Sequence, residues 1–381
     1  MITKLPVDLA EEILSRVPLK HMRAVKLTCK KWNALSKTLS FRKLHIGKAS
    51  DTTKEGESQM IVMMDYNLYL MSVVVNDVDP YTQLKGKLTC LDEQVKISQV
   101  FHCEGLLLCI LKDDITRYVV WNPYCGQTRW IKPRFSYPPR KGHSFNYALG
   151  YENKKYCRSH KFLRFIEHYV DGPDKLWCEI YNFDYDLWKN LDANPNWRIE
   201  SRDKGVSLKG NTYWCVREKN SGFLGKDYII CFDFTRERFG PLLPLPFKYS
   251  DNCLVALSSV GEEKLVVFPN RKYEHIEIWI TTKIEVGNMS WSRFLTVDVG
   301  SYTYIPFTLL FGSDDGYESL IIDEVKKVAF VIDKCFKSNR VDIIGEAGYV
   351  RFSQVDLVEP TDIYIKCQPQ VYSYVPSPVQ I

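Results

Sequence analysis

The first forty residues alternate apolar and polar positions with the period of an α-helix. From position 9 to position 17, apolar residues recur at intervals of three and four, which places them on one stripe of an amphipathic helix. Asp8 stands just before this run as a candidate N-cap, and Pro18 ends it. Shorter patterns of the same kind predict a second helix around Met22 and a third around Trp32. The stripe of the first helix consists of Leu9, Ile13, Leu14 and Val17.

These three predicted helices carry more apolar surface than they can bury among themselves. A unit of about forty residues forms only a thin core, and such small units are marginally stable alone. Two interpretations follow from the residues. The helices either pack against the rest of the same chain or present a docking surface to another protein.

The pattern changes after a short polar segment, which we interpret as a linker over residues 47–57. From residue 58 to residue 381, short runs rich in Val, Ile, Tyr, Trp and Phe alternate with turns rich in Gly, Asn, Asp and Pro. This alternation is typical of β-strands. The sequence therefore predicts a helical domain over residues 1–46 and a large all-β domain over residues 58–381.

One pattern recurs within the β region: an alternating strand, a polar turn and then an aromatic residue. The clearest copies, followed by two weaker ones, cover residues 118–130, 179–188, 228–239, 276–291 and 328–333. We place the residue that opens the turn at Asn122, Asn182, Asp233, Ile280 and Asp333, with spacings of 60, 51, 47 and 53.

A period near fifty residues is typical of a propeller blade, as in kelch-like repeats. The faces of each small sheet are covered only by neighbouring blades, so the unit repeats until a ring closes. The length of the region predicts a β-propeller of about six blades. A large β-sandwich is the alternative architecture.

Composition limits the classes of protein that fit. The chain has 381 residues, of which 45% are hydrophobic and 25% charged, as is ordinary for globular proteins. It lacks an apolar run of the length that spans a membrane, and it lacks a secretory signal. Its twelve Cys are scattered without a C-x-x-C pair, which favours reduced thiols and a location in the cytoplasm or nucleus.

Charge is unevenly distributed along the chain. Residues 1–48 hold eleven Lys or Arg and three Asp or Glu, a net charge of +8, which leaves −3 of the total +5 for the remainder. The basic residues alternate with apolar positions, so we interpret them as the solvated faces of the helices. They can steer the helices toward an acidic partner. We expect neither a nucleic acid nor a membrane as a partner.

A search for reactive constellations assigns no catalytic residue, no cofactor and no metal. Glycine-rich phosphate-binding loops and nucleophile elbows are missing from the sequence. Cys157, His160 and His168 do not complete a four-ligand zinc set. We predict a β-turn, not a calcium loop, at residues 312–316. The chain is expected not to be an enzyme. The alternative is a propeller enzyme whose reactive groups converge from different blades.

The N-terminal segment resembles the F-box, in the pattern Leu-Pro-x-Asp-Leu-x-x-Glu-Ile-Leu-x-Arg-Val-Pro from Leu5 and the later Cys-Lys-x-Trp-x-x-Leu from Cys29. The resemblance implies docking on a Skp-type adaptor, which joins a cullin scaffold and, indirectly, a RING subunit. The implied adaptor-binding residues are Leu5, Pro6, Leu9, Ile13, Leu14, Val17, Pro18, Leu19, Met22, Leu27, Cys29, Trp32 and Leu35.

The β region resembles the F-box-associated domain of plant F-box proteins. The resemblance rests on residues 121–131, 149–165, 232–246 and 372–381. It implies a non-catalytic substrate receptor of an SCF (Skp-cullin-F-box) ubiquitin ligase, which brings an unknown target protein to the ligase. The alternative is a propeller-type binding protein that acts outside ubiquitination.

Target recognition is expected in loops, which a rigid scaffold holds in place. Residues 134–140 form the candidate loop, because it is long, aromatic, basic and poor in strand signals. Its candidate contacts are Arg134, Phe135, Tyr137 and Arg140. By contrast, we interpret the recurring aromatic residues of the hairpins as core residues that pack between sheets.

Overall fold

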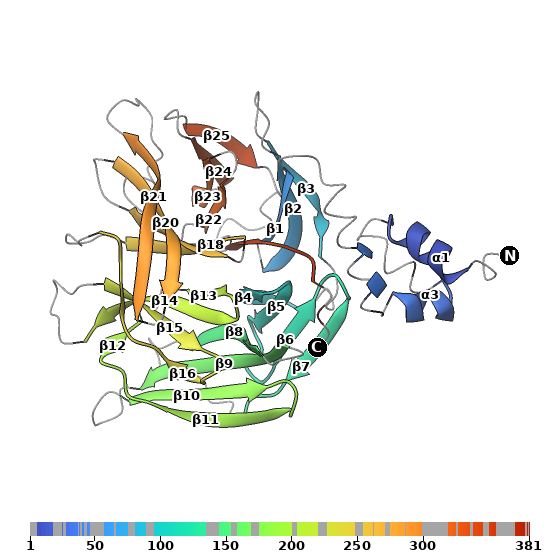
Figure 1. The fold of residues 1–381 in the computed structure, drawn as a ribbon, viewed down its shortest axis with the longest axis horizontal. Helices are drawn as coiled ribbons and strands as arrows, with labels where there is room; N and C mark the ends of the chain where they lie inside the picture. Colours follow the sequence, from blue (N-terminus) through green and yellow to red (C-terminus); the bar gives the residue numbers. More distant parts are fainter. Residues whose placement is uncertain are drawn as a thin grey trace.

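The structure is a computed structural model. It describes residues 6–17, 25, 28–36, 38, 40–41, 44–45, 57–64, 66–74, 81–88, 95–134, 145–153, 158–168, 175–199, 204–219, 227–247, 254–261, 263–270, 275–285, 287–298, 319–324, 327–335, 338–345, 350–355, 370–377, 379 and 381. Helices near the N-terminus stand beside a large body of β-sheets (Figure 1).

Two helices of the N-terminal module are described, α1 (Val7–Leu14) and α3 (Lys30–Leu35). The residue before α1 is Pro6, so Asp8 lies in the first turn and is not the N-cap that we predicted. A carboxylate in that turn still favours the helix dipole. Cys29 caps α3, where its Sγ accepts a hydrogen bond from the backbone N–H of Trp32 at 3.5 Å. Of the predicted second helix, Met22 lies outside the described residues.

The core of this module is as thin as its length requires. Leu14 and Phe41 are its fully buried hydrophobic residues, and partly buried neighbours surround them. Those neighbours are Val17, Val25, Trp32 and Leu35. One stripe of α1 is thus used inside the module, and the rest of the helix remains at the surface.

The described strands form six sheets, one for each blade. The first three blades are built from β26 (Gln370–Ser373), β1 (Glu57–Met64), β2 (Asn67–Val74) and β3 (Tyr81–Lys87); β4 (Ile97–Cys103), β5 (Leu106–Leu111), β6 (Tyr118–Asn122) and β7 (Gln127–Ile131); and β8 (Asn146–Asn153), β9 (Arg158–His168), β10 (Lys175–Asn182) and β11 (Leu187–Ala193).

The remaining three blades follow the same antiparallel order, with split edge strands in the fourth. They are built from β12 (Trp197–Arg198), β13 (Val206–Leu208), β14 (Asn211–Glu218), β15 (Asp227–Asp233), β16 (Arg238–Phe239) and β17 (Leu243–Pro244); β18 (Leu254–Val260), β19 (Lys264–Asn270), β20 (His275–Glu285) and β21 (Asn288–Asp298); and β22 (Ser319–Asp323), β23 (Val328–Cys335), β24 (Ser338–Gly345) and β25 (Val350–Val355).

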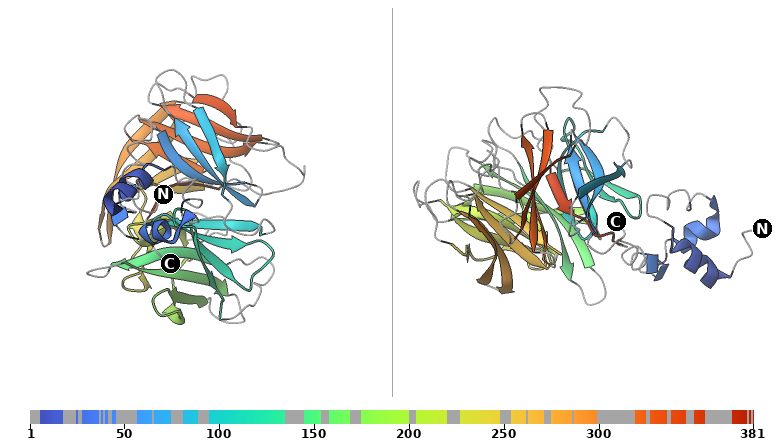
Figure 2. Two further views of the ribbon diagram at one scale, coloured as in Figure 1. Left: turned by 90° about the vertical axis from the view of Figure 1, so that its right-hand side faces the viewer. Right: turned by 90° about the horizontal axis from the view of Figure 1, so that it is seen from above.

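The six sheets close into a ring. Their inner strands contact one another from blade to blade, in the order β4, β8, β13, β18, β22, β26 and back to β4. The C-terminal strand β26 pairs antiparallel with the N-terminal strand β1, so both ends of the domain complete the same blade. Viewed from the side of the helices, the sheets spread radially (Figure 2). The fold is the six-bladed propeller that the repeat predicted, and not the alternative β-sandwich.

Three of the five predicted turn positions are structurally equivalent. Asn122, Asn182 and Asp233 each end the third strand of a blade, and each side chain accepts a hydrogen bond from a backbone N–H of its own turn. Ile280 and Asp333 were wrong, because they lie inside β20 and β23, which continue beyond them. The error arose because an alternating strand looks alike at every position, whereas an Asx side chain marks the turn itself.

Aromatic residues from adjacent blades meet between the sheets. At the boundary of blades 3 and 4, the rings of Phe165 and Trp214 lie 5.5 Å apart, and the Phe239 ring lies 5.6 Å from that of Phe165. Edge-to-face contacts of this kind stabilise the packing beyond the area that they bury. The core role predicted for the hairpin aromatic residue Phe239 therefore agrees with the structure, whereas Trp130 is exposed.

The two ends of the propeller differ. We call the end that carries the turns after the inner strands the hairpin end, and the opposite end the loop end, because the connections between blades lie there. Turns of neighbouring blades meet at the hairpin end: the N–H of Tyr151 donates to the carbonyl of Gly210 at 3.0 Å, and Lys209 forms an ion pair with Glu263 at 2.9 Å. The helices lie beside this end, where the C-terminus also ends (Figure 1).

Candidate functional site

The exposed face of α1 is an apolar surface. Val7, Leu9 and Ile13 are 63%, 52% and 50% exposed, whereas Ala10 and Leu14 point into the module. Large aliphatic side chains gathered on one face of a short helix mark a protein-binding surface. We call Val7, Leu9 and Ile13 the α1 face.

The structure sorts the predicted adaptor-binding residues into groups. Pro6, Leu9 and Ile13 lie at the surface. Leu14 is 2% exposed and lies in the core of the module beneath the α1 face. Cys29 and the residues Val17, Trp32 and Leu35 are half-buried. The remaining predicted residues lie outside the described part of the chain: Leu5, Pro18, Leu19, Met22 and Leu27.

Sequence reasoning missed Val7, which is the most exposed large hydrophobic residue of the described helices. We had placed the start of the helix at Asp8, so Val7 fell outside the stripe. Pro6 was the indication in the sequence, because a proline is common at the N-terminal edge of a helix and here the first turn of α1 begins at the next residue.

The candidate target loop is described only at its first residue. Arg134 follows β7 at the loop end of the propeller, is exposed, and donates from Nη1 to Oδ1 of Asn190 at 3.4 Å. Just before it, the carbonyl of Lys132 accepts a hydrogen bond from Nε1 of Trp188 at 2.8 Å. Phe135, Tyr137 and Arg140 lie outside the described residues. Arg134 is thus placed at the end of the propeller that lies away from the helices.

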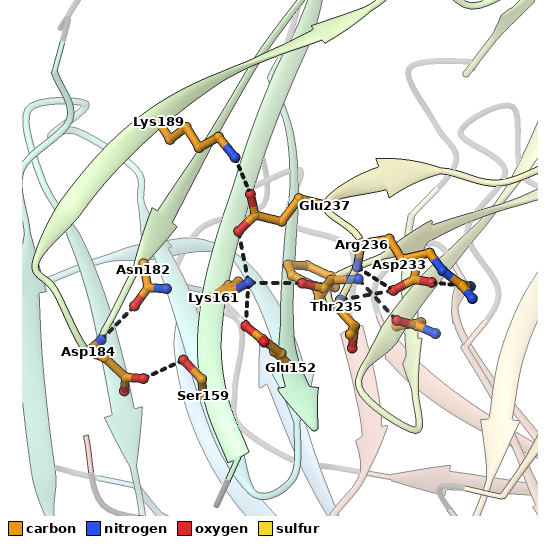
Figure 3. Close-up of polar contacts among 12 residues, drawn as sticks. Glu152, Ser159, Lys161, Asn182, Asp184, Lys189, Asp233, Thr235, Arg236 and Glu237 are labelled. Carbon is orange, nitrogen blue, oxygen red and sulfur yellow. Dashed lines mark hydrogen bonds and ion pairs between the residues drawn. The ribbon is translucent and has the colours of Figure 1, made fainter. Parts of the chain in front are cut away.

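A network of charged residues joins blades 3 and 4 (Figure 3). The buried Lys161 donates from Nζ to Glu152 at 2.8 Å, to Glu237 at 2.8 Å and to the carbonyl of Phe234 at 3.1 Å. Glu237 also accepts from Lys189 at 2.7 Å. All three hydrogens of the Lys161 ammonium group are therefore donated, and the network connects blade 3 to blade 4 through ion pairs and hydrogen bonds.

The pKa values of this network follow from its pairing. Burial lowers the pKa of Lys161, but hydrogen bonds to Glu152 and Glu237 outweigh it and leave that pKa raised. Burial likewise raises the pKa of Glu237, and the two lysines outweigh it and leave that pKa lowered. Both groups are charged at neutral pH, so neither is tuned for proton transfer near pH 7.

A second ion pair is buried inside blade 3. Arg164 donates from Nε to Glu179 and from Nη1 to the hydroxyl of Tyr118 at 2.9 Å, and both charged side chains are sealed from solvent. Its guanidinium carbon lies 5.0 Å from the ring of Trp177 and 5.3 Å from that of Trp188. Burial raises the pKa of Glu179 and the nearby guanidinium offsets part of that rise. Because both side chains are buried, breaking the pair by removing one partner would leave an uncompensated charge inside blade 3.

A cavity of about 260 Å³ is lined by residues of β11, β12 and β16. Its walls include Trp197, Phe239, Asp192 and Arg238, together with the thiol of Cys178. Burial raises the pKa of that thiol to about 12, which leaves it protonated and unreactive as a nucleophile. The described residues hold no group of three metal-ligating side chains.

None of the described helices is long and apolar enough to cross a membrane. The described features define a two-part binding protein: a small helical module with an exposed apolar face, attached to a six-bladed propeller. The family profile of the F-box domain matches residues 2–44, and that of the F-box associated beta propeller domain matches residues 59–381.

Close relatives are known from Arabidopsis thaliana. An F-box/kelch-repeat protein is 53% identical over 100% of this chain and 90% of its own length, and an F-box protein is 51% identical over 100% of this chain and 91% of its own. Among solved structures, the six-bladed β-propeller lectin of Aleuria aurantia is similar over 80% of this chain and 97% of that chain, with 11% identity and a TM-score of 0.42.

The chain belongs to the plant F-box proteins that carry an F-box-associated β-propeller domain. Its domains are those of an adaptor-type protein, and the F-box implies a Skp-type adaptor as partner.

Proposed function

We propose that this protein is the substrate-recognition subunit of an SCF ubiquitin ligase, acting in the cytoplasm or nucleus. The F-box holds a Skp-type adaptor, which links it to a cullin and a RING subunit, and the propeller holds a target protein. The transfer chemistry belongs to the RING subunit and its conjugating enzyme. This chain contributes proximity, because it raises the effective concentration of target lysines near the charged enzyme.

The α1 face carries this proposal. About half of each of the Leu9 and Ile13 surfaces is exposed. Complete burial of such a side chain is worth about 1.5–3 kcal/mol, so covering the exposed half of both contributes roughly 1.5–3 kcal/mol in total. That free energy corresponds to a factor of about 10–100 in the dissociation constant.

The test is the affinity of the full-length protein for a purified Skp-type adaptor, measured by calorimetry. We expect Leu9→Ala/Ile13→Ala to weaken binding within that range. The matched control is Glu11→Ala on the same helix, which removes a half-buried side chain outside the apolar face and should leave affinity within threefold. Equal affinity of the parent and the double variant would refute the assignment of the α1 face.

The loop end is the proposed target-binding surface, because the described helices of the F-box stand beside the hairpin end, at the opposite end of the propeller (Figure 1). Arg134 lies there; the other candidate residues, Phe135, Tyr137 and Arg140, lie outside the described part of the chain. Proximity labelling under proteasome inhibition would identify proteins that accumulate around the parent. We expect a variant carrying Arg134→Ala and Arg140→Ala to lose those proteins while it still binds the adaptor. Unchanged labelling would move the target site elsewhere on the propeller.

The second candidate function is a propeller-type binding protein that acts outside ubiquitination. An F-box that holds the adaptor without a cullin would serve such a role. Purification from cells separates the two cases. Adaptor, cullin and RING subunit together support the ligase, whereas adaptor without cullin supports the alternative.

A further inference from the structure

Among the described residues, His45 at the end of the F-box contacts the propeller. His45 is 1% exposed, and its Nε2 lies 2.6 Å from the carbonyl oxygen of Val17, just beyond the end of α1. Its Nδ1 lies 2.9 Å from the hydroxyl of Tyr124, in the turn between β6 and β7. The ring also stacks on Phe41 of the F-box core at 5.7 Å between centroids. His45 therefore contacts the segment that follows the first helix, the F-box core and the propeller at once.

The roles of the two ring nitrogens follow from their partners. A backbone carbonyl only accepts, so Nε2 of His45 carries the proton that is donated to Val17. In the neutral imidazole Nδ1 is then an acceptor, and the hydroxyl of Tyr124 donates to it. Each bond depends on a different atom of the same ring, so the ring orientation fixes the F-box relative to Tyr124.

The turn that carries Tyr124 is itself held by the C-terminal tail. Asn122 is fully buried, and its Oδ1 accepts from the N–H of Cys125 at 3.1 Å, within the turn. Its Nδ2 donates to two tail carbonyls, those of Ser377 at 3.1 Å and Val379 at 2.6 Å. The backbone of Tyr124 makes a further hydrogen bond to the side chain of Tyr374.

The tail is anchored by more than these bonds. Val379 and Ile381 pack against the hydrophobic cluster shared by blades 2 and 3. Ser377 passes so close to the turn after β4 that a Cβ on Gly105 would lie 2.6 Å from the Cβ of Ser377. The described residues of the tail therefore pack closely against the hairpin end of the propeller.

We propose that the described residues of the C-terminal tail (374–377, 379 and 381) and the turn after β6 form a joint that fixes the angle between the F-box and the propeller. The tail holds the turn, the turn presents Tyr124, and His45 transmits that position to the F-box. The joint sets the direction from the adaptor to a target bound at the loop end. It acts in the free protein, so its test stands apart from adaptor or target binding.

The test measures the spread of distances between the two domains in the full-length protein. Fluorophores on genetically encoded amino acids replace exposed Ala34 in α3 and exposed Leu187 in blade 3, which avoids labelling any of the twelve Cys. Single-molecule energy transfer then reports the distribution. We expect a narrow distribution for the parent and a width at least twofold greater for Tyr124→Phe, which removes one hydroxyl.

Two tail variants test the second half of the joint. Deletion of residues 379–381 removes the Val379 carbonyl, and Asn122→Asp replaces the donating amide with a carboxylate of the same shape. Near-ultraviolet circular dichroism identifies the variants that keep the tertiary packing of the parent. Each tail variant that keeps it should broaden the distribution of interdomain distances as Tyr124→Phe does. Combined with Tyr124→Phe, it should broaden the distribution no further, because both changes act on one joint.

The matched control is Tyr213→Phe, a buried tyrosine of blade 4 far from the joint, which should leave the width unchanged. Broadening by Tyr124→Phe without broadening by a folded tail variant would overturn the proposal, since the tail would then have no part in it. An unchanged width for every variant, or equal broadening by the control, would overturn it as well.

Discussion

The buried pair of Arg164 and Glu179 gives a sharp prediction about stability. Replacing Glu179 with Leu leaves a guanidinium sealed from water without its anion. Removing one partner of a buried ion pair costs about 3–5 kcal/mol. The aromatic rings around Arg164, which lie 5.0–5.8 Å from its guanidinium carbon, stay in place. These cation–π contacts are present in both the parent and the variant, so they do not change the difference in stability, and we expect a loss of about 3–5 kcal/mol.

The double variant Arg164→Met/Glu179→Leu removes both charges. Replacing a buried ion pair with apolar residues of similar volume is often neutral. The hydroxyl of Tyr118 then loses its guanidinium partner, which costs about 1 kcal/mol. We therefore expect the double variant to be more stable than Glu179→Leu by about 2–4 kcal/mol, which is the sign of a charge effect and not of a packing effect.

Urea unfolding of the full-length protein tests this order. Fluorescence of the nine Trp and far-ultraviolet circular dichroism serve as two probes, whose agreement supports a single transition. At a slope of about 3 kcal/mol per M, the midpoint of Glu179→Leu should fall by roughly 1–1.7 M. The reasoning fails if that single variant loses less than 1 kcal/mol, or if the double variant is no more stable than the single one.

Three further predictions concern pH and backbone geometry. Burial lowers the pKa of His102 from 6.5 to about 4, so the free energy of unfolding that the neutral ring contributes is present above pH 6.5 and is lost as pH falls toward 4. In urea unfolding at a series of pH values, the free energy of unfolding of His102→Asn should therefore fall by about 2–3 kcal/mol less than that of the parent between pH 6.5 and 4. The pKa of Glu237 is lowered by Lys161, so the stability that the ionised Glu237 contributes is lost as pH falls below about 4.5. The melting temperature of Glu237→Gln should therefore fall less steeply than that of the parent below this pH. Gly105 has φ +71° and no room for a Cβ beside Ser377, so Gly105→Ala should lower the free energy of unfolding by about 1–3 kcal/mol and increase hydrogen exchange in the tail. A variant that behaves like the parent in any of these three experiments would contradict the cause stated for it.

The sequence predicted the elements whose chemistry is local. Asn122 and Asp233 mark turns because an Asx side chain bonds to the backbone of its own turn, and that signal is visible in one dimension. The period of the repeat was estimated from five positions, of which three are such turns, and the ring architecture followed from the period. Ile280 was placed wrongly because nothing local distinguishes the middle of a strand from its end.

The joint could not be predicted in the same way. His45 stands between Leu44 and Ile46, where no local pattern marks it as a contact residue, and its partner Tyr124 lies 79 positions away. The resemblance implied adaptor binding by Leu14, Leu9 and Ile13 alike, and a stripe on a helix shows which residues share a face but not which of them are buried inside the module. Burial inside the F-box depends on Phe41, which folds back from a later part of the chain.

Ring closure by β26 also determines how late during synthesis the propeller can close. Met60 in β1 pairs with Ser373, so the first strand of the propeller is made 313 residues before its partner. At about 5–20 residues per second, the ribosome needs roughly 15–60 s to deliver that partner. During this interval β1 presents an unpaired edge, which is a template for pairing with other chains. A nascent or prematurely terminated chain can already carry a finished F-box on an open ring, and such a chain is a natural client for chaperones.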